Sequence, residues 1–451
     1  MKILRKINTL LDGGQKAYLI WLLVLMLISA FLEAASITMI FPVLQAIIEP
    51  GAVNQGLTGW LYRFLGCNSV NSFLITVMVI MIVAFVIKNL FLLYEQKSLF
   101  HFIYDNQYRM SKRMMNSYLH KGYETYLNLD SAVALRVITT DVSNMFYYIL
   151  ALMQLISEIV MFAVLAALML VTNALMTLFI SAVLIITLLI IKVTIKPTVR
   201  KAGQDNQDYY SAEMKWINQS VAGIKDIKIS STERYFMDQF DENGRAYVSA
   251  VQKFNVLGAT PRLLIETVCI AAVMGYLIFL VVKGEDMSSM TSLMGLLALA
   301  IARLMPCVNR MNNYLTSLAY YEPFFLGVSD ELQQEVNSNL AKQTFEDWSK
   351  AEKMPVKEEI LLKDITYAYP GTEKRIFDHA TVSFPVGKSI GIVGESGAGK
   401  TTLVDILLGL LQVQEGAVLA DGVNVQENYH GFLKNVGYIP QNIFMIDDTI
   451  E

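Results

Sequence analysis

The sequence contains few cysteines and few charged residues for its length. Its 451 residues include 3 cysteines, Cys67, Cys269 and Cys307, which lie far apart and form no CxxC pair. This spacing indicates neither a disulfide framework nor a cysteine-based zinc site. Only 17% of the residues are charged, whereas soluble domains carry about 25%. A disordered chain, a coiled coil and an ordinary soluble protein are therefore excluded.

Apolar residues are correspondingly abundant. The residue types AVILMFWYC make up 54% of the chain, compared with about 45–50% in soluble domains. The excess has to be kept from water in another way, so the composition indicates a membrane protein. The length leaves room for a second domain. The net charge of −4 gives no reason to expect a nucleic acid partner.

Six apolar stretches are long enough to cross a bilayer as helices. A hydrocarbon core of about 30 Å requires about 20 largely apolar residues per helix. These stretches are residues 18–48, 72–94, 145–171, 175–195, 257–282 and 287–304. The first is too long and too apolar for a cleaved signal peptide. The predicted fold class is therefore an all-α, six-helix membrane domain.

Basic residues between the spans predict how this domain is oriented. Residues 94–144 and 192–256 are rich in lysine and arginine, whereas the opposite side offers only Arg63 and Lys283. By the positive-inside rule, both long segments and both termini are cytoplasmic. Both segments also keep helical periodicity, so the membrane helices should continue into the aqueous phase. Residues 1–11 predict an amphipathic helix on the inner leaflet, the alternative being a disordered basic tail.

The composition changes near residue 327 and predicts three regions. Residues 1–326 form the transmembrane domain, and residues 327–356 form a polar linker. Residues 357–451 have the periodicity of an α/β domain with a parallel sheet.

A phosphate-binding motif lies in this last region. The apolar run 389–393 (SIGIV) is typical of a buried parallel strand, and it leads into GESGAGKTT and then the apolar helix 403–411. The motif GxxxxGK[ST] thus has its required strand, loop and helix context. The expected nucleotide-binding residues are Gly394, Glu395, Ser396, Gly397, Ala398, Gly399, Lys400, Thr401 and Thr402.

Each residue type in this motif suits phosphate chemistry. The glycines at 394, 397 and 399 let successive backbone N–H groups turn inward around phosphate oxygens at the start of a helix. Lys400 supplies a cation for the β- and γ-phosphates, and the Thr401 hydroxyl can bind Mg²⁺.

Two flanking features make the site more specific. A predicted strand upstream of the motif ends in an aromatic residue, Tyr369, and the predicted strand 437–441 ends in Gln441. With the predicted hairpin 416–422 between them, this order resembles the ATP-binding cassette family. The resemblance implies that Tyr369 stacks on adenine and that Gln441 contacts Mg²⁺ and senses the membrane domain. The alternative for Tyr369 is packing in the core, and strand alternation does not separate it from Tyr367.

The whole chain resembles an ABC exporter half-transporter. The resemblance implies a homodimer that sandwiches ATP between two cassettes and switches an inward-facing cavity outward. It also implies that turns near residues 126–132 and 223–228 dock on nucleotide domains, the alternative being solvated charged loops.

Several family motifs have no counterpart in the sequence. There is no LSGGQ-type signature, no later acidic strand and no histidine after Gln441. Hydrolysis needs groups that position water and stabilise the transferring phosphoryl, so no catalytic residue is predicted here. We expect a fragment of a longer protein, the alternative being a degenerate subunit that pairs with a complete one.

Three basic residues are candidates for substrate recognition. Lys88, Arg262 and Arg303 lie about 22–31 Å from the outer ends of their spans, at 1.5 Å per residue. Charges inside a membrane domain are functional candidates, and these would suit an anionic headgroup. The alternative is that they reach the interface or pair with Glu158 and Glu266.

Segments 31–42, 260–266 and 302–310 resemble flippases of the PglK type, which move lipid-linked oligosaccharides in bacterial protein glycosylation. This resemblance implies a pyrophosphate-linked lipid substrate and the bacterial inner membrane. Peptide and lipid exporters share the architecture and remain alternatives. A membrane-anchored P-loop kinase is a further alternative, although it has no use for six spans.

Overall fold

The computed structural model consists of two compact units. The first comprises Met1–Asn116 and Ser131–Ser338, and the second comprises Ser117–Asp130 and Asn339–Glu451. The structure describes residues 6, 12–38, 62–63, 65–66, 69–127, 129–172, 174–283, 287–337 and 350–440.

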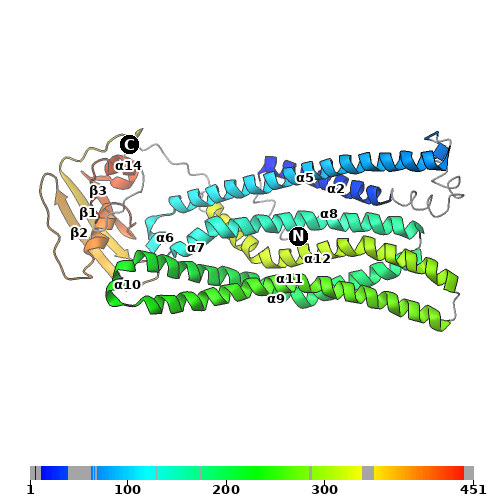
Figure 1. Ribbon diagram of the computed structural model, residues 1–451. Coiled ribbons are helices and arrows are strands. Elements are labelled where there is room, and N and C mark those ends of the chain that lie inside the picture. The colour runs from blue at the N-terminus through cyan, green and yellow to red at the C-terminus, as the bar shows by residue number, and fades with distance from the viewer. Residues whose placement is uncertain are drawn as a thin grey trace. The chain divides into compact units, whose positions relative to one another are not determined.

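The first unit is built from long helices that run alongside one another (Figure 1). They are α2 (Gly13–Thr38), α5 (Val70–His120), α8 (Val142–Thr172), α9 (Ala174–Ala222), α11 (Glu233–Lys283) and α12 (Met287–Asn337). Shorter segments are α7 (Ser131–Arg136), the π-helical η2 (Val137–Asp141) and α10 (Ile224–Ser230). With 51 residues, α5 is about 77 Å long at 1.5 Å per residue. The helices therefore continue well beyond a 30 Å hydrocarbon core, as the periodicity predicted.

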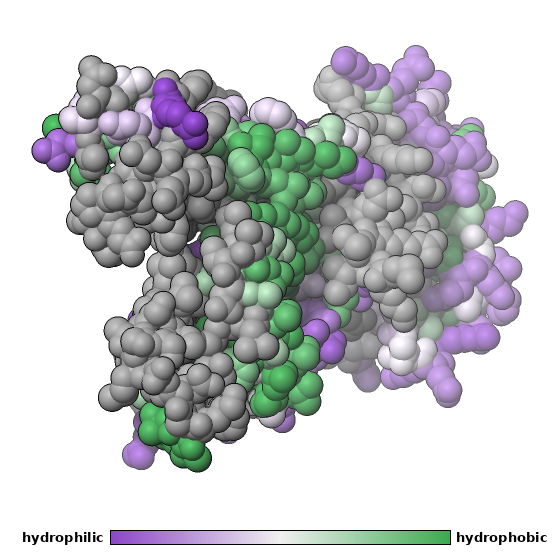
Figure 2. All heavy atoms as spheres, turned by 90° about the vertical axis from the view of Figure 1, so that its right-hand side faces the viewer, coloured by the Kyte–Doolittle hydropathy of each residue, from purple (hydrophilic) through white to green (hydrophobic). Residues whose placement is uncertain are grey.

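Five helices in the described part of the chain are long and apolar enough to cross a membrane. Many of their apolar side chains are exposed, including Ile82 (65%), Leu90 (61%) and Ile190 (58%). In Figure 2, hydrophobic residues (green) gather near the middle of the face turned to the viewer. So much exposed apolar surface is stable only in a bilayer, so the chain is a multi-pass membrane protein.

The predicted count of six spans is not confirmed. The first predicted span, 18–48, extends past α2 into residues outside the described part. The last, 287–304, falls in the first part of α12, whose side chains up to residue 303 are not described. The predicted tight connection at 172–174 agrees with the ends of α8 and α9. The predicted helix 1–11 lies outside the described residues except for Lys6.

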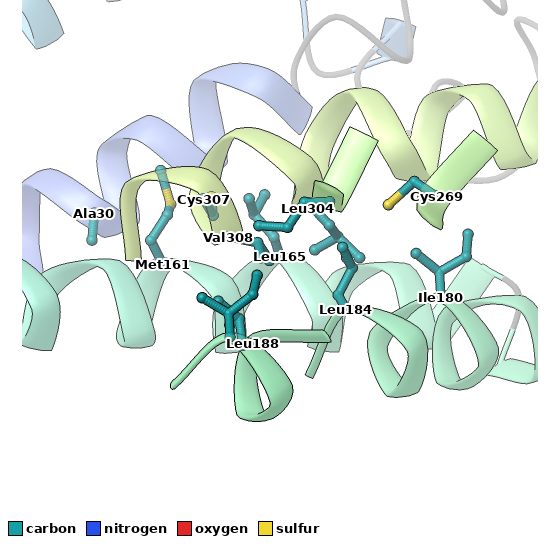
Figure 3. Close-up of a cluster of buried hydrophobic side chains, with 12 residues drawn as sticks. Ala30, Met161, Leu165, Ile180, Leu184, Leu188, Cys269, Leu304, Cys307 and Val308 are labelled. Carbon is teal, nitrogen blue, oxygen red and sulfur yellow. The ribbon is translucent and has the colours of Figure 1, made fainter. Parts of the chain in front are cut away.

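A hydrophobic cluster joins five of the long helices (Figure 3). Its α9 members are Ile180, Leu184, Leu188 and Ile191, a spacing that places all four on one helical face. The other members come from α2, α8, α11 and α12: Ala30, Met161, Leu165, Ile265, Cys269, Leu304, Cys307 and Val308. The two cysteines are buried in this cluster and form no disulfide.

Helices α9 and α12 approach each other closely at Gly203. A Cβ at this position would lie 2.2 Å from the backbone oxygen of Tyr320. We expect Gly203→Ala to lower the free energy of unfolding by about 1–3 kcal/mol, because the helices would have to move apart. Thermal unfolding in detergent measures this. In Gly275→Ala, the matched control, the added Cβ meets nothing within 4 Å, so equal destabilisation of both variants would contradict the close-approach argument.

The second unit contains a four-stranded antiparallel sheet of order β2-β1-β3-β4. Its strands are β1 (Glu359–Ala368), β2 (Arg375–Pro385), β3 (Glu415–Ala420) and β4 (Val423–Asn424). Its helices are α6 (Tyr123–Leu127), α13 (Lys400–Leu407), the 3-10 turn η5 (Val425–Asn428) and α14 (Tyr429–Leu433). Leu362 and Ile365 of β1, Ile406 of α13 and Phe432 of α14 meet in its core.

The prediction of a parallel sheet is wrong for the described residues. Residues 389–393 and 437–440 form no strand there, and Ile390 (47%) and Val393 (92%) are exposed. A buried parallel strand needs hydrogen-bonding neighbours on its edges, and no strand in the described part of the unit pairs with either segment. The antiparallel sheet forms instead from two hairpins, β1 with β2 and β3 with β4, joined by the pairing of β1 with β3.

The predicted hairpin 416–422 is present as β3 and β4. Its turn residues Asp421 and Gly422 have φ of 48° and 84°, as a two-residue Asp-Gly turn requires. The Asp421 carboxylate also accepts hydrogen bonds from the backbone N–H groups of Lys357, Glu358 and Glu359 at 2.6–3.0 Å. This turn therefore ties the hairpin to the start of β1.

These three N–H donors hold the pKa of Asp421 below its ordinary value of 3.8. Because this pKa is lower in the folded than in the unfolded state, the ionised carboxylate stabilises the fold at pH values above the unfolded-state pKa. This stabilisation is lost as the pH falls through the folded-state pKa. We expect the midpoint temperature of unfolding to decrease as the pH is lowered from about 5 to 3. In Asp421→Asn this decrease should be smaller. Circular dichroism melts across this range test it, and an unchanged slope in Asp421→Asn would contradict it.

Candidate nucleotide-binding site

The predicted phosphate loop is a tight turn at the start of α13. Gly397 and Gly399 have φ of 83° and 87°, which disfavours any residue with a Cβ. At Gly399 a Cβ would also lie 2.8 Å from Cγ2 of Ile376. The Ala398 N–H donates to the backbone oxygen of Glu395 at 3.2 Å. The sequence thus permits a compact loop that a bulkier residue would open.

Lys400 lies within this loop. Its Nζ donates hydrogen bonds to the backbone oxygens of Gly394 at 2.9 Å and Glu395 at 2.7 Å. The loop therefore curls around the ammonium group that the motif provides for phosphate. Glu395, Ser396 and Ala398 are exposed, so the outer part of the loop is open to a ligand.

These residues fit a nucleotide phosphate. A loop with left-handed glycines, a lysine within it and a helix that starts at Lys400 gathers positive charge and N–H donors. Mg²⁺ takes few protein ligands and binds substrate phosphates and water, so one hydroxyl, that of the exposed Thr401, is sufficient. No group of three or more acidic, histidine or cysteine residues that could hold a metal occurs within the described ranges.

Tyr369 lies beside the start of α13. Its hydroxyl oxygen is 2.8 Å from that of the buried Thr402, and its ring is half-buried next to Tyr367, with the centroids 5.3 Å apart. Tyr367 itself is fully buried in the core of the unit. Of the two tyrosines left open by the strand pattern, only Tyr369 has an accessible ring. Gln441 lies outside the described residues.

A short segment from the helical half of the sequence belongs to this unit. The backbone N–H of Gln412 donates to Oε1 of Glu124, in α6, at 3.2 Å. The pKa of Tyr123 is raised by burial and, less, by the nearby carboxylate of Asp405. Burial, followed by Glu124, also raises the pKa of Tyr367. Sequence analysis placed a docking turn at 126–132, close to these contacts, but did not identify Glu124.

The three predicted substrate residues are not brought into one described site. Lys88 lies over the Phe85 ring at 4.9 Å, Arg262 is exposed, and the side chain of Arg303 is outside the described part. Glu158, considered as their partner, instead accepts a hydrogen bond from Nε of Arg310 at 2.6 Å. Arg310 was not identified from the sequence, although an arginine next to an apolar span can be recognised there as a functional candidate.

Several curated proteins are similar to parts of this chain. Among them are three proteins that are each named ATP-dependent lipid A-core flippase. They come from Haemophilus influenzae (31% identity over 97 residues), Sodalis glossinidius (32% over 118) and Desulfotalea psychrophila (36% over 97). The matches cover 21%, 26% and 21% of this chain and 16%, 20% and 17% of the relatives. The chain thus matches about a fifth of the length of these relatives.

Family models cover much more of the chain. Residues 377–450 match the family described as ABC transporter, an ATP-binding domain, which includes the phosphate loop. Residues 14–303 match the family described as ABC transporter transmembrane region. These matches support the resemblance to an ABC exporter half-transporter, whereas nothing among them supports the resemblance to the PglK type. Because the transmembrane model alone spans well over half of the sequence, this chain belongs to the ABC transporters.

Proposed function

We propose that the protein uses ATP to flip or export an amphipathic, anionic lipid across the bacterial inner membrane. The observation that carries this proposal is the joining, in one chain, of apolar membrane-length helices to a phosphate loop that encloses Lys400. Residues 1–326 would be the transmembrane domain, 327–356 the linker and 357–451 the nucleotide-binding domain. The basic long segments favour cytoplasmic termini.

The nucleotide would be held by residues 394–402. Lys400 would bind the β- and γ-phosphates, Thr401 and Gln441 would bind Mg²⁺, and Tyr369 would stack on adenine. Mg²⁺ supplies charge neutralisation at the phosphates when bound. Tyr369 is supported by its position beside Thr402 at the start of α13.

The active assembly would be a homodimer, as is typical of half-transporters. The sequence has no counterpart of the family's signature, acidic strand or switch histidine. We therefore propose that this chain binds ATP without hydrolysing it alone, and that hydrolysis belongs to the full-length protein. A second candidate, a degenerate partner subunit, is favoured by the same missing motifs, and stable co-purification with a complete cassette subunit would support it.

The substrate class is supported by the relatives, which are named for flipping lipid A-core. A pyrophosphate-linked lipid oligosaccharide is the more specific substrate suggested by the PglK-type segments. Both classes combine lipid chains with an anionic headgroup, which Lys88, Arg262 and Arg303 would receive if they face the transport cavity.

Arginine variants of the full-length protein test this substrate site. We expect Arg262→Ala and Arg303→Ala each to raise the lipid concentration for half-maximal ATPase stimulation by about tenfold, since each removes a charge-assisted contact. Basal ATPase should not change. Arg63→Ala, which changes a cation outside the spans, is the control. Equal stimulation in parent and variants would show that these arginines only reach the interface.

A further inference from the structure

A cavity lies between α8, α9 and α12 in the helical unit. Its volume is about 160 Å³, enough for a phosphate group or about five water molecules. Its apolar lining includes Ile191 and Ile195 of α9. Its polar lining consists of Tyr148, Lys192, Lys196, Asn312, Thr316 and Glu322.

This lining contains an unpaired donor. Asn312 is 1% exposed, and its Nδ2 has no hydrogen-bond partner. Buried polar groups in folded proteins are almost always paired, so an orphaned donor points to a missing acceptor. A ligand with an acceptor oxygen in the cavity would satisfy it.

The charges around the cavity favour an anion. Lys192 and Lys196 both line it, and its one carboxylate, Glu322, is shared between two cations. Oε2 of Glu322 lies 3.9 Å from Nζ of Lys196 and 3.6 Å from Nε of Arg200, and it makes no hydrogen bond to either. Cations therefore outnumber the carboxylate, and Lys192 has no ion pair among the described residues.

The cavity also lies at the depth of a lipid headgroup. Counted from the first residue of α9, Lys192 is about 27 Å and Lys196 about 33 Å along the helix. A hydrocarbon core of about 30 Å ends between them. The lysines thus lie at the boundary with the headgroups, while Ile191 and Ile195 offer apolar contact beside them.

We infer that this cavity binds the phosphate-bearing headgroup of a membrane lipid. Lys192 and Lys196 pair with the phosphate, the Asn312 Nδ2 donates to one of its oxygens, and the isoleucines contact the adjoining chain. Basic pockets between membrane helices bind anionic headgroups in this way. The inference goes beyond the proposed function, because the bound lipid need not be transported and no nucleotide is involved.

Native mass spectrometry of the chain released from nanodiscs tests this site. The nanodiscs contain phosphatidylglycerol and phosphatidylcholine in equal amounts, without nucleotide. The parent should retain phosphatidylglycerol preferentially. Lys192→Gln with Lys196→Gln should raise its dissociation constant by about tenfold or more, because two charges next to the phosphate are lost.

Lys97→Gln is the matched control. Lys97 is exposed on α5, about 40 Å from the start of that helix, so it shares the general attraction to the membrane surface but not the cavity. Its retention of phosphatidylglycerol should match the parent. Equal losses in Lys97→Gln and in the double variant would overturn the inference.

Asn312→Leu tests the role of the cavity independently of surface charge, because it changes the lining without removing a charge. It replaces an unpaired buried donor by an apolar side chain of similar size, so its thermal stability should equal or exceed that of the parent. Its retention of phosphatidylglycerol should still fall severalfold, and unchanged retention would contradict the assignment. Short-chain phosphatidylglycerol should displace the bound lipid, whereas displacement by inorganic phosphate alone would show an anion site without lipid specificity.

Discussion

Lys400→Ala should weaken binding of Mg²⁺-ATP by about a hundredfold, because a charge-assisted contact to phosphate is worth about 2–3 kcal/mol or more. The Nζ of Lys400 already lies inside the phosphate loop on the backbone oxygens of Gly394 and Glu395. Its loss removes the cation at the centre of the proposed site. Equilibrium binding of a fluorescent ATP analogue to the purified chain measures the effect.

Lys388→Ala provides the control, since Lys388 is an exposed lysine of the same unit and lies outside the motif. It should bind ATP as the parent does. Lys400→Arg should restore the charge but recover little binding, because the loop encloses an ammonium group and a guanidinium is larger. If Lys400→Ala bound the analogue as tightly as the parent, the loop would not be the nucleotide site.

Arg310→Met should lower the free energy of unfolding of the helical unit by about 3 kcal/mol, because it leaves a largely covered carboxylate without its cation. Glu158 is 15% exposed and accepts from Nε of Arg310, and Glu33 is close enough to interact with both. Arg310→Met thus leaves two neighbouring carboxylates without Arg310. Glu158→Leu still leaves Glu33 near Arg310, so its loss should be smaller.

A double-mutant cycle isolates this pair. Arg310→Met with Glu158→Leu should cost less than the sum of the single variants, because the double variant leaves neither partner of the pair behind. Thermal or denaturant unfolding in detergent measures the change in the free energy of unfolding for each single variant and for the double variant. Additive losses would show that the two side chains do not act as a pair, despite the 2.6 Å separation.

Local features of this protein could be predicted from sequence. The phosphate loop and the Asp421-Gly422 hairpin depend on residues next to one another in the chain, and glycines mark both. The long helices were equally visible, because apolar residues recur with the helical period over more than 20 positions. These elements needed no knowledge of distant contacts.

Features that depend on distant residues were missed or wrong. The run 389–393 has the composition of a buried strand, but strand formation depends on neighbours that sequence pattern does not provide. Tyr367 and Tyr369 could not be separated, because the full burial of Tyr367, near Glu124 of α6, and the half-exposure of Tyr369 both depend on distant residues. Likewise, Arg310, the partner of Glu158, lies 152 positions away in sequence.

Lipid flipping in proteoliposomes tests the central claim most directly. The full-length protein is reconstituted with a fluorescent pyrophosphate-linked lipid, and the fraction that crosses the bilayer is measured with and without Mg²⁺-ATP. We predict ATP-dependent flipping by the parent and none above background by the Lys400→Ala form. Flipping at the parental rate by Lys400→Ala, or flipping by the parent without ATP, would contradict the proposal that this ABC transporter moves an anionic lipid with the energy of ATP.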